Sequence, residues 1–475
     1  MTRCGISRER PRVALILPYN TFWEAAVPYD LRAEREAIAD RVASALAGTV
    51  DVVARGTVAS VEDGATLARQ LEAARAEAAL VLQTLAVMPA YTQAVLRPLP
   101  DLPVVVWTAH RQERLPADFD HGAITSEGAT VGTPMLTNTL VRAGRPFELV
   151  VGRVDDPLTI EAVAGALRAA AAASRLRRAR IGRVGPVFQG YDCVDADDSR
   201  LRTATGIDAV RIEAAELREL YLAVEPARVR ELESEARAIF TVAEDVEGDS
   251  LARTLRAAAA LDDLVERHRL DAGAINCHVP EIRFGADVGI APCYALGRQT
   301  SNGIPWACAG DVVTAVAMLT LKLLGAAAQY HELESLDYET GELVIASSGE
   351  HDLAFGDGAR PALIRNLWFD GDEHCGACAC FGAPAGPATL VGFTELDGPQ
   401  PGYRYIVAPG AFTATAWPGV GTPYAAFRFS GDDAVASWIR WCRAGANHHS
   451  AATPGELARQ VAAVAAFLGV EAVTV

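Results

Sequence analysis

The sequence has no apolar run long enough to cross a membrane, and its cysteines do not suggest a disulfide framework. A membrane-spanning helix needs about 20 consecutive apolar residues, whereas the first apolar run covers only Val13–Pro18. That run is also too short for the core of a signal peptide, so it predicts a buried first strand. The nine cysteines are an odd number in a long chain, which is not the pattern of a secreted, disulfide-rich protein. We therefore expect a cytoplasmic protein.

The sequence also has fewer basic than acidic residues. The 43 Lys and Arg residues stand against 60 Asp and Glu residues, which gives a net charge of −17. A chain this acidic has no general attraction to nucleic acid or to an anionic membrane, so neither is expected as a partner. The Arg-rich stretch at 175–183 is the exception, and we interpret it as a solvated helix end that leads into a strand.

Residues 1–175 alternate short apolar runs with longer amphipathic stretches. The run at Pro103–Thr108 is typical of the first kind, and the stretch from Tyr29 to Leu46 is typical of the second. Apolar runs separated by segments of helical length favour a parallel sheet that is flanked by helices. We therefore predict a doubly wound α/β domain at 1–175.

Residues 176–330 show a second pattern of the same kind. A strand at Arg180–Pro186 is followed by helical patterns such as Ser250–Arg269, a buried strand at Ala272–His278 and a helix at Ala309–Leu324. Gly182 and Gly185 form a Gly-x-x-Gly after the first strand, but glycines mark any tight turn, so no nucleotide is expected. These residues predict a second doubly wound α/β domain.

From residue 331 to 475 the pattern changes to strands. Strand-like segments separated by Gly, Pro and Asp turns occur at 341–347, 388–395, 404–410 and 424–430. This spacing favours an antiparallel barrel or sandwich, closed by a helix at Thr453–Leu468 and a short strand. The predicted fold class is α/β, with two doubly wound α/β domains followed by a mostly antiparallel β C-terminal domain.

Four segments, taken in order, carry a family resemblance. They are ITSEGATVGTPMLTNTLVRAGRPFELVVGRVDD at 124–156, GIAPCYALGRQTSNGIPWACAGDVVTAVAMLTLKLLG at 289–325, QYHELESLDYETGELVIASSGEHD at 329–352 and NHHSAATPGELARQVAAVAAFLGVEAV at 447–473. Together they resemble the L-fucose/L-arabinose isomerase superfamily. The resemblance implies an enzyme that converts an aldose to its ketose, as a homo-oligomer that is a trimer or a hexamer.

The resemblance also implies a divalent ion, Mn²⁺ or similar, held by two acidic residues and a histidine. A hard cation on both reacting oxygens stabilises the negative charge of the enediolate. A carboxylate within reach can then carry the proton between the two carbons. In this sequence, however, the first acid would stand at Ala309, which has no ligating group.

Two acidic residues remain near the expected positions. Asp311 follows Ala309, and it either caps the helix that begins there or substitutes for the lost acid. The second acid aligns with Glu332, or with Glu334 if the alignment slips by two residues. Glu332 and Asp311 are therefore the predicted catalytic residues.

The implied mid-chain histidine is replaced by Ser347 or Ser348. Either Glu350 or His351 supplies a ligand from a shifted backbone, or this segment is a plain hairpin turn. The implied C-terminal histidine is present as the pair His448 and His449, of which only one can face a given site. The resemblance gives Glu332 and His449 as metal ligands, and the predicted substrate-binding residues are His448, Glu350 and Cys308.

The segment His374–Cys380 contains Cys375, Cys378 and Cys380. One interpretation is a zinc half-site, and the other is a set of buried thiols that pack a β core. The leading functional hypothesis is a sugar isomerase that acts on a polyhydroxylated carbohydrate. The alternatives are a catalytically degenerate sugar-binding or regulatory protein, and a metal-independent enzyme that uses Asp311, Glu332 and Glu350 in the same pocket.

Overall fold

The computed structural model describes residues 9–366, 368, 374–398, 401–431 and 433–475, without the side chains of residues 333 and 334. The chain forms two compact units. One, here called the N-terminal unit, contains Glu9–Arg175 and Ala466–Gly469. The other, the C-terminal unit, contains Leu176–Ala465 and Val470–Val475. The predicted domain boundaries stay predictions.

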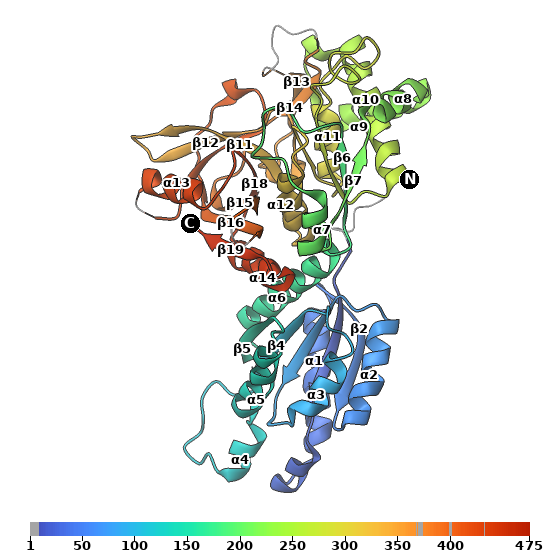
Figure 1. Ribbon diagram of the computed structural model, residues 1–475. Helices are drawn as coiled ribbons and strands as arrows, with labels where there is room; N and C mark the ends of the chain where they lie inside the picture. The colour runs from blue at the N-terminus through green and yellow to red at the C-terminus, as the bar shows by residue number, and fades with distance from the viewer. Residues whose placement is uncertain (1–8, 367, 369–373, 399–400, 432) are drawn as a thin grey trace. The chain divides into compact units, whose positions relative to one another are not determined.

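The N-terminal unit is built on a five-stranded parallel sheet, drawn in blue to teal in Figure 1. Its strands, in the order in which they pair, are β2 (Asp51–Val58), β1 (Arg12–Pro18), β3 (Ala78–Gln83), β4 (Val104–His110) and β5 (Phe147–Arg153). The helices between them are α1 (Leu31–Leu46), α2 (Val61–Ala73), α3 (Pro89–Leu96), α4 (His121–Ser126) and α5 (Ala129–Arg142), followed by α6 (Pro157–Leu176). Strand β3 is buried at every position, as expected for a parallel strand that has helices on both faces.

The C-terminal unit contains a second sheet of parallel strands, in the order β10-β9-β6-β7. These strands are β10 (Trp306–Ala307), β9 (Ala272–Ile275), β6 (Arg180–Val184) and β7 (Asp208–Ile212). Its helices are α7 (Asp198–Thr205), α8 (Ala214–Ala223), α9 (Pro226–Ile239), α10 (Asp249–His268), α11 (Cys293–Ser301) and α12 (Val312–Leu323). Because all the strands are parallel, their carboxyl ends meet at one edge of the sheet, which is where α/β proteins place functional groups.

The same unit contains a β-barrel. Its strands are β11 (Gln329–Asp337), β12 (Glu342–Ala346), β15 (Gly386–Leu396), β16 (Gly402–Phe412), β17 (Tyr424–Phe429) and β18 (His449–Pro454). Neighbouring strands are antiparallel in the order β15-β18-β11-β12-β17-β16, and a further β15–β16 pairing closes the ring. Strand β19 (Glu471–Thr474) adds to β16 in parallel. A smaller sheet pairs β13 (Ala362–Arg365) with β14 (Ala377–Cys380) and β8 (Thr241–Val242).

The predicted fold class is confirmed, and two helix boundaries are wrong. The last helix, α14 (Ala458–Leu468), does not include Thr453, which lies in β18. Strand β18 ends at Pro454, which has no N–H to donate to the ladder, and Gly455, with φ +104°, begins the short segment that separates the strand from the helix. Helix α12 begins at Val312 rather than Ala309. Within the described ranges, no helix combines the length and apolar character that crossing a bilayer requires.

Replacing Arg269 with glycine is expected to stabilise the protein by about 1 kcal/mol. Arg269 ends α10 in the left-handed region, at φ 54° and ψ 49°, where an L side chain is strained and glycine is not. Urea denaturation of Arg269→Gly measures the effect. The matched control is Glu266→Gly, three residues earlier inside the same helix, which is expected to destabilise by about 1 kcal/mol. Equal destabilisation by both changes would contradict the strain at Arg269.

Candidate functional site

The turn between β10 and α12 has an unusual backbone. Ala309 has φ +56° and Gly310 has φ +77°, so two successive residues lie in the left-handed region. The Ala309 carbonyl accepts a hydrogen bond from the Phe188 N–H at 3.2 Å. A Cβ atom on Gly310 would lie 3.2 Å from the Cα of Val187, so the loop after β6 packs closely here. This turn delivers Asp311 to the carboxyl edge of the parallel sheet.

Asp311 is the predicted N-cap of α12, and it has a second function. Its Oδ1 accepts from the Thr314 N–H at 2.8 Å, and its Oδ2 accepts from the Thr314 hydroxyl at 2.7 Å. The same Oδ2 lies 2.9 Å from Nδ1 of His449 and accepts from the Asn447 amide at 3.3 Å. Both the aspartate and the histidine are buried. The cap and a buried carboxylate–histidine pair are therefore one structure.

His449 is held with its second ring nitrogen toward Glu332. The contact with Asp311 implies a proton on Nδ1, so in the neutral imidazole the lone pair lies on Nε2. That Nε2 lies 3.7 Å from Oε1 of Glu332, too far for a hydrogen bond. The approach follows from strand register, because Glu332 in β11 is paired with His449 in β18, and paired side chains on one face are neighbours. The Glu332 side chain is 21% exposed, so this carboxylate is accessible.

The ring of His448 lies against that of His449, with 3.8 Å between the ring centroids, so the two side chains do not diverge as expected for neighbours in a strand. The Nδ1 of His448 lies 3.9 Å from the thiol of Cys193, and its ring packs edge-on against Tyr191 at 5.3 Å between centroids. Burial, with a smaller contribution from His449, lowers the pKa of His448 to about 4. It is therefore neutral near pH 7. Both rings pack against Tyr191, and the two histidines differ in their polar contacts: His449 contacts Asp311 and Glu332, whereas His448 contacts Cys193.

The turn after β12 is held rigidly. The Ser347 hydroxyl donates to the Glu350 carbonyl at 2.7 Å, and the Gln329 amide donates to the same oxygen at 2.8 Å. Asn366 donates to the Ser348 carbonyl at 2.8 Å. Gly349 has φ +131°, and a Cβ there would lie 2.5 Å from the Asn366 amide nitrogen, so only glycine fits. Although this segment is a turn, it is buried and specifically bonded rather than a plain surface hairpin.

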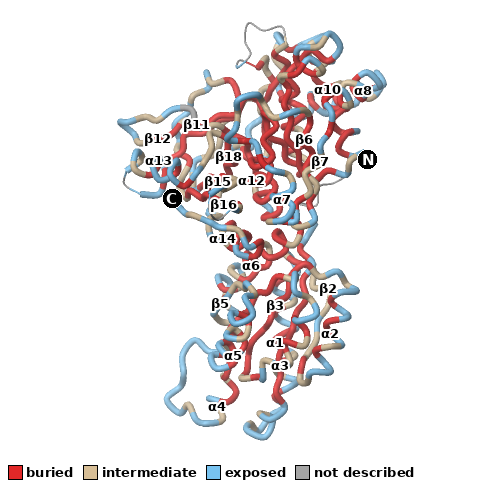
Figure 2. The backbone as a smooth tube through the Cα atoms, in the orientation of Figure 1, coloured by how far each residue is buried: buried red, intermediate tan, exposed pale blue. Residues whose placement is uncertain are grey.

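This turn places Ser348 between two carboxylates. The Ser348 Oγ lies 3.5 Å from Oε1 of Glu332 and 3.3 Å from Oε2 of Glu350. The Tyr330 hydroxyl also donates to Oε1 of Glu332, at 3.4 Å. We use the name carboxylate–histidine cluster for Asp311, Glu332, Ser348, Glu350 and His449. It lies within the C-terminal unit, on segments such as β18 and α12 that are almost wholly buried (Figure 2).

Cys308 lies on the inner side of this cluster. It is buried and interacts with Cys277, which follows β9, and with Glu350. The hydrogen bond between the two thiols lowers the pKa of Cys277 and raises that of Cys308. Strands β9 and β10 are parallel neighbours, so their carboxyl ends bring the two cysteines together. Cys277 is a residue that the sequence reading missed.

The structure therefore brings Asp311, Glu332, Glu350 and His449 together, with Cys308 beside Glu350. It separates His351, whose ring packs against Phe240 and Tyr294. The side chain of Glu334 lies outside the described residues. The sequence reading also missed Ser348 as a bridge and Asn447, which donates to Asp311 and accepts from the His449 N–H at 2.9 Å. The position of Asn447, directly before His448 and His449, was the sequence feature that could have identified it. The functional roles of the predicted residues stay predictions.

Cys375 and Cys378, in the segment 374–380, have different contacts. Cys378 belongs to a small buried cluster with Ala291 and Cys293, whereas Cys375 accepts from Arg365 Nε at 3.2 Å. His374 contacts the Gly289 carbonyl through Nδ1 at 2.8 Å. Cys378 is therefore packed in a buried interior, which is the second of the two interpretations given for this segment.

The side chains present fall short of a three-ligand metal site. Glu332 and His449 converge, and the Asp311 contact is of the kind that orients a ligating imidazole. Ala309 supplies no donor, and across the part of the chain that is described no three His, Cys, Asp or Glu side chains gather with metal-binding spacing. The donor set is thus two of the three implied ligands, and Mn²⁺ binding stays a prediction.

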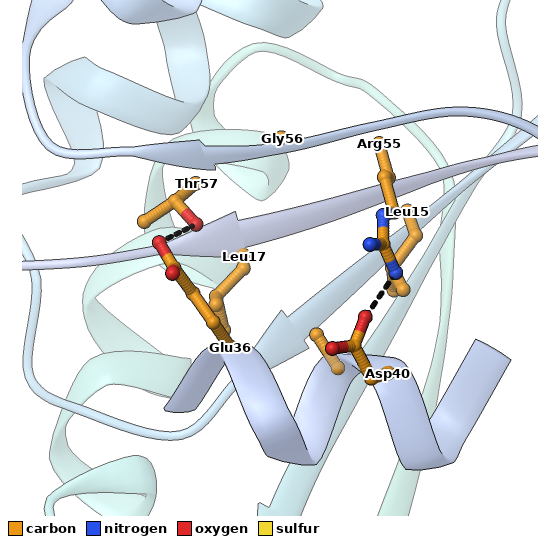
Figure 3. Close-up of a pocket in the computed structure, with 8 residues that line it drawn as sticks. Leu15, Leu17, Glu36, Asp40, Arg55, Gly56 and Thr57 are labelled. Carbon is orange, nitrogen blue, oxygen red and sulfur yellow. Dashed lines mark hydrogen bonds and ion pairs between the residues drawn. The ribbon is translucent and has the colours of Figure 1, made fainter. Parts of the chain in front are cut away.

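The N-terminal unit has a hollow of about 200 Å³ of its own, between α1 and the strands β1 and β2 (Figure 3). Its polar groups are already paired with one another. Arg55 forms an ion pair with Asp40, and the Thr57 hydroxyl donates to Glu36 at 2.9 Å (Figure 3). The Arg55–Asp40 pair is largely exposed, so solvent screens its charges. The carboxylate–histidine cluster is the better candidate for chemistry.

The fold and the cluster define an α/β protein with a β-barrel and a buried acid–imidazole centre, and comparison with known proteins adds to this. No family model matches the chain. Two relatives named sulfoquinovose isomerase, from Priestia aryabhattai and Priestia megaterium (strain ATCC 12872 / QMB1551), are each 24% identical over 325 residues. The match covers 67% of this chain and 68% of each relative.

A further relative, named L-arabinose isomerase, comes from Mycolicibacterium smegmatis (strain ATCC 700084 / mc(2)155). It is 25% identical over 185 residues, which cover 39% of this chain and 36% of the relative. The chain is therefore similar to proteins named as sugar isomerases. Membership of the L-fucose/L-arabinose isomerase superfamily itself stays a prediction.

Changing Asp311 to asparagine is expected to lower kcat by about 10–100-fold, the usual effect of removing a carboxylate that orients an imidazole. Asparagine still caps a helix, so the fold is expected to remain. Its amide hydrogens, however, favour the His449 tautomer with the proton on Nε2. NMR of ¹⁵N-histidine measures the tautomer, and thermal unfolding is the control for folding. An unchanged tautomer in Asp311→Asn would contradict this assignment.

Proposed function

We propose that this chain is a sugar isomerase that converts an aldose into its ketose. The observation that carries the proposal is the Asp311–His449–Glu332 arrangement, in which a buried carboxylate orients an imidazole toward an accessible carboxylate. The similarity to two proteins named sulfoquinovose isomerase and to one named L-arabinose isomerase supports the same reaction class.

The reaction moves a proton between C2 and C1 and rearranges the protons on O1 and O2. Glu332 has the accessible carboxylate, so we assign it the transfer between the carbons, as general base and then as general acid. The lone pair of His449 Nε2 accepts a hydrogen bond from a substrate hydroxyl and fixes its orientation. Asp311 keeps that imidazole in one tautomer. Tyr191, whose ring centroid lies 6.1 Å from that of His449, offers an aromatic face to the sugar carbons.

The substrate class is a polyhydroxylated aldose. A panel should include sulfoquinovose and L-arabinose, the sugars in the names of the relatives, together with fucose, glucose and mannose. Ketose formation is measured by NMR for the wild-type protein and for His449→Ala. Conversion of at least one aldose by the wild type and its loss in His449→Ala is the expected result. Absence of conversion across the panel would contradict the proposal.

Ala309 favours a second candidate, a sugar-binding protein without catalysis, because one implied acidic ligand is missing at this turn. The two candidates differ in one measurement. A binding protein shifts its melting temperature with a sugar of the panel but leaves that sugar unchanged in the NMR assay, whereas an isomerase does both. Elemental analysis of the purified protein tests the alternative arrangement, in which Glu332 and His449 would hold Mn²⁺ or another divalent ion in place of the roles assigned above.

We propose that the enzyme is a homo-oligomer, as the resemblance implies, and that it is cytoplasmic, as expected from its cysteines and its short N-terminal apolar run. Light scattering coupled to size-exclusion chromatography measures the number of subunits. A trimer or a hexamer is the expected result, and a monomer at all concentrations would contradict it.

A further inference from the structure

The hydroxyl of Ser348 lies near two carboxylates but has only one hydrogen to donate. The Ser348 Oγ lies within 3.5 Å of Glu332 Oε1 and 3.3 Å of Glu350 Oε2. If both carboxylates were ionised, one of the two contacts would bring lone pairs together. One proton on Glu350 resolves this, because Glu350 then donates to Ser348 and Ser348 donates to Glu332. The contacts thus form a directional chain.

The surroundings of Glu350 favour that proton. Its side chain is 1% exposed, and its Oε1 is buried without a hydrogen-bond partner. Burial raises the pKa of Glu350 to about 7, and Cys277 and Glu332 raise it further, while hydrogen bonds from its own backbone and from the Cys308 thiol act in the opposite direction. The titratable groups that interact with it from the surrounding elements are all neutral or negative: Cys277 after β9, Cys293 on α11, Cys308 after β10, Tyr330 and Glu332 on β11, and Cys378 on β14.

We propose that Ser348 and Glu350 form a second proton-transfer arm of the site, which exchanges protons with the substrate oxygens while Glu332 moves the proton between the carbons. This inference rests on the proposed isomerase function. Ser348 is the residue that contacts the substrate oxygen, and Glu350 acts through it as a proton store. Because the Gln329 and Asn366 side chains hold the turn independently of Ser347, the arm is formed before substrate binds and does not depend on the Ser347 hydroxyl.

The proton transfers between the substrate and these residues balance without any other reactant. Glu332 removes the proton from C2 as Ser348 donates its hydroxyl proton to the carbonyl oxygen O1 and takes one from Glu350. This gives the enediol, with Glu350 ionised. Glu332 then delivers its proton to C1 as the O2 hydroxyl returns a proton to Ser348 and hence to Glu350. The aldose has become the ketose, and all three residues are restored.

The kinetic test compares Ser348→Ala and Glu350→Gln with Ser347→Ala. Ser347 lies in the same turn, but its hydroxyl bonds only backbone groups, the Glu350 carbonyl and the Gly349 N–H. Ser348→Ala and Glu350→Gln are expected to lower kcat by about 10²–10⁴-fold, the usual contribution of an acid–base group, with KM changed only a few-fold. In the wild type kcat falls as pH rises through the pKa of about 7 of Glu350, and this limb is absent in Glu350→Gln.

Ser347→Ala is expected to keep both the pH limb and most of kcat. Equal losses in all three variants would mean that the turn is only structural, and would overturn the relay. So would a Glu350→Gln enzyme that keeps wild-type kcat. Either result leaves the isomerase function standing, because the wild type still converts the sugar.

A second measurement does not depend on activity. In protein labelled with ¹³C at glutamate carboxyl carbons, the signal lost in Glu350→Gln identifies Glu350. It is expected to titrate near its pKa of about 7 and to change when Ser348 is replaced by alanine. Titration near the ordinary glutamate value of about 4.3, unaffected by Ser348→Ala, would overturn the proposal even if no substrate has been found.

Discussion

Glu332→Gln is expected to lower kcat by about 10³-fold or more, within the range typical of a lost acid–base group. Glutamine has the same shape and can still accept from Tyr330 and Ser348, but it cannot take a proton from carbon. Because substrate binding is largely retained, KM should change little. Initial rates of ketose formation measure both constants.

The matched control is Glu339→Gln, an exposed glutamate in the turn that joins β11 to β12. It carries the same chemical change on the same hairpin, and wild-type rates are expected. If Glu332→Gln were as active as this control, Glu332 would not be the group that carries the proton. Exchange of the C2 hydrogen with D₂O is a second, independent measurement of proton removal. This exchange should stop in Glu332→Gln, even where ketose formation is too slow to measure.

Lys322→Met is expected to destabilise the protein by about 3–5 kcal/mol, the usual result of leaving one partner of a buried ion pair alone. Lys322 Nζ lies 2.5 Å from Oδ2 of Asp352, and both side chains are buried. The same oxygen accepts from the Ala328 N–H at 2.7 Å. Without the ammonium group, the Asp352 carboxylate must remain charged in an apolar interior or take up a proton. The urea midpoint of unfolding measures the loss.

The double variant Lys322→Met with Asp352→Asn provides the control. Asparagine can still accept from Ala328, and no charge is left buried, so part of the lost stability is expected to return. The single variant Asp352→Asn completes the comparison. If the loss of stability in the double variant equals the sum of the losses in the two single variants, the two residues are not coupled. Activity is expected to fall only in proportion to unfolding, since neither side chain contacts the cluster directly.

Much of the fold could be predicted because its strands carry local signals. The parallel strands β3 and β9 are short, wholly buried apolar runs, and the helices between them have amphipathic patterns. The barrel strands β15 and β17 were recognisable for the same reason. Strand β18 was not, because His449–Pro454 is short and contains little that separates a strand from the start of a helix.

The candidate site depended more on tertiary structure. The family resemblance placed Asp311, Glu332 and His449 in the set, but it could not show that Asp311 both caps α12 and pairs with His449. Nor could it choose between His448 and His449, because that choice depends on the register of β18 against β11. The bridge made by Ser348 arises from a turn whose conformation Gly349 and Asn366 determine through contacts between distant segments.

The most direct test of the central claim is NMR of the wild-type protein with the aldose panel in D₂O, alongside Glu332→Gln. The wild type is expected to convert at least one aldose into its ketose, with deuterium appearing at C1 or C2, and Glu332→Gln is expected to leave that sugar unchanged. A wild-type protein that binds the sugar, shown by a shift in its melting temperature, yet leaves every aldose unconverted and unlabelled would contradict the claim.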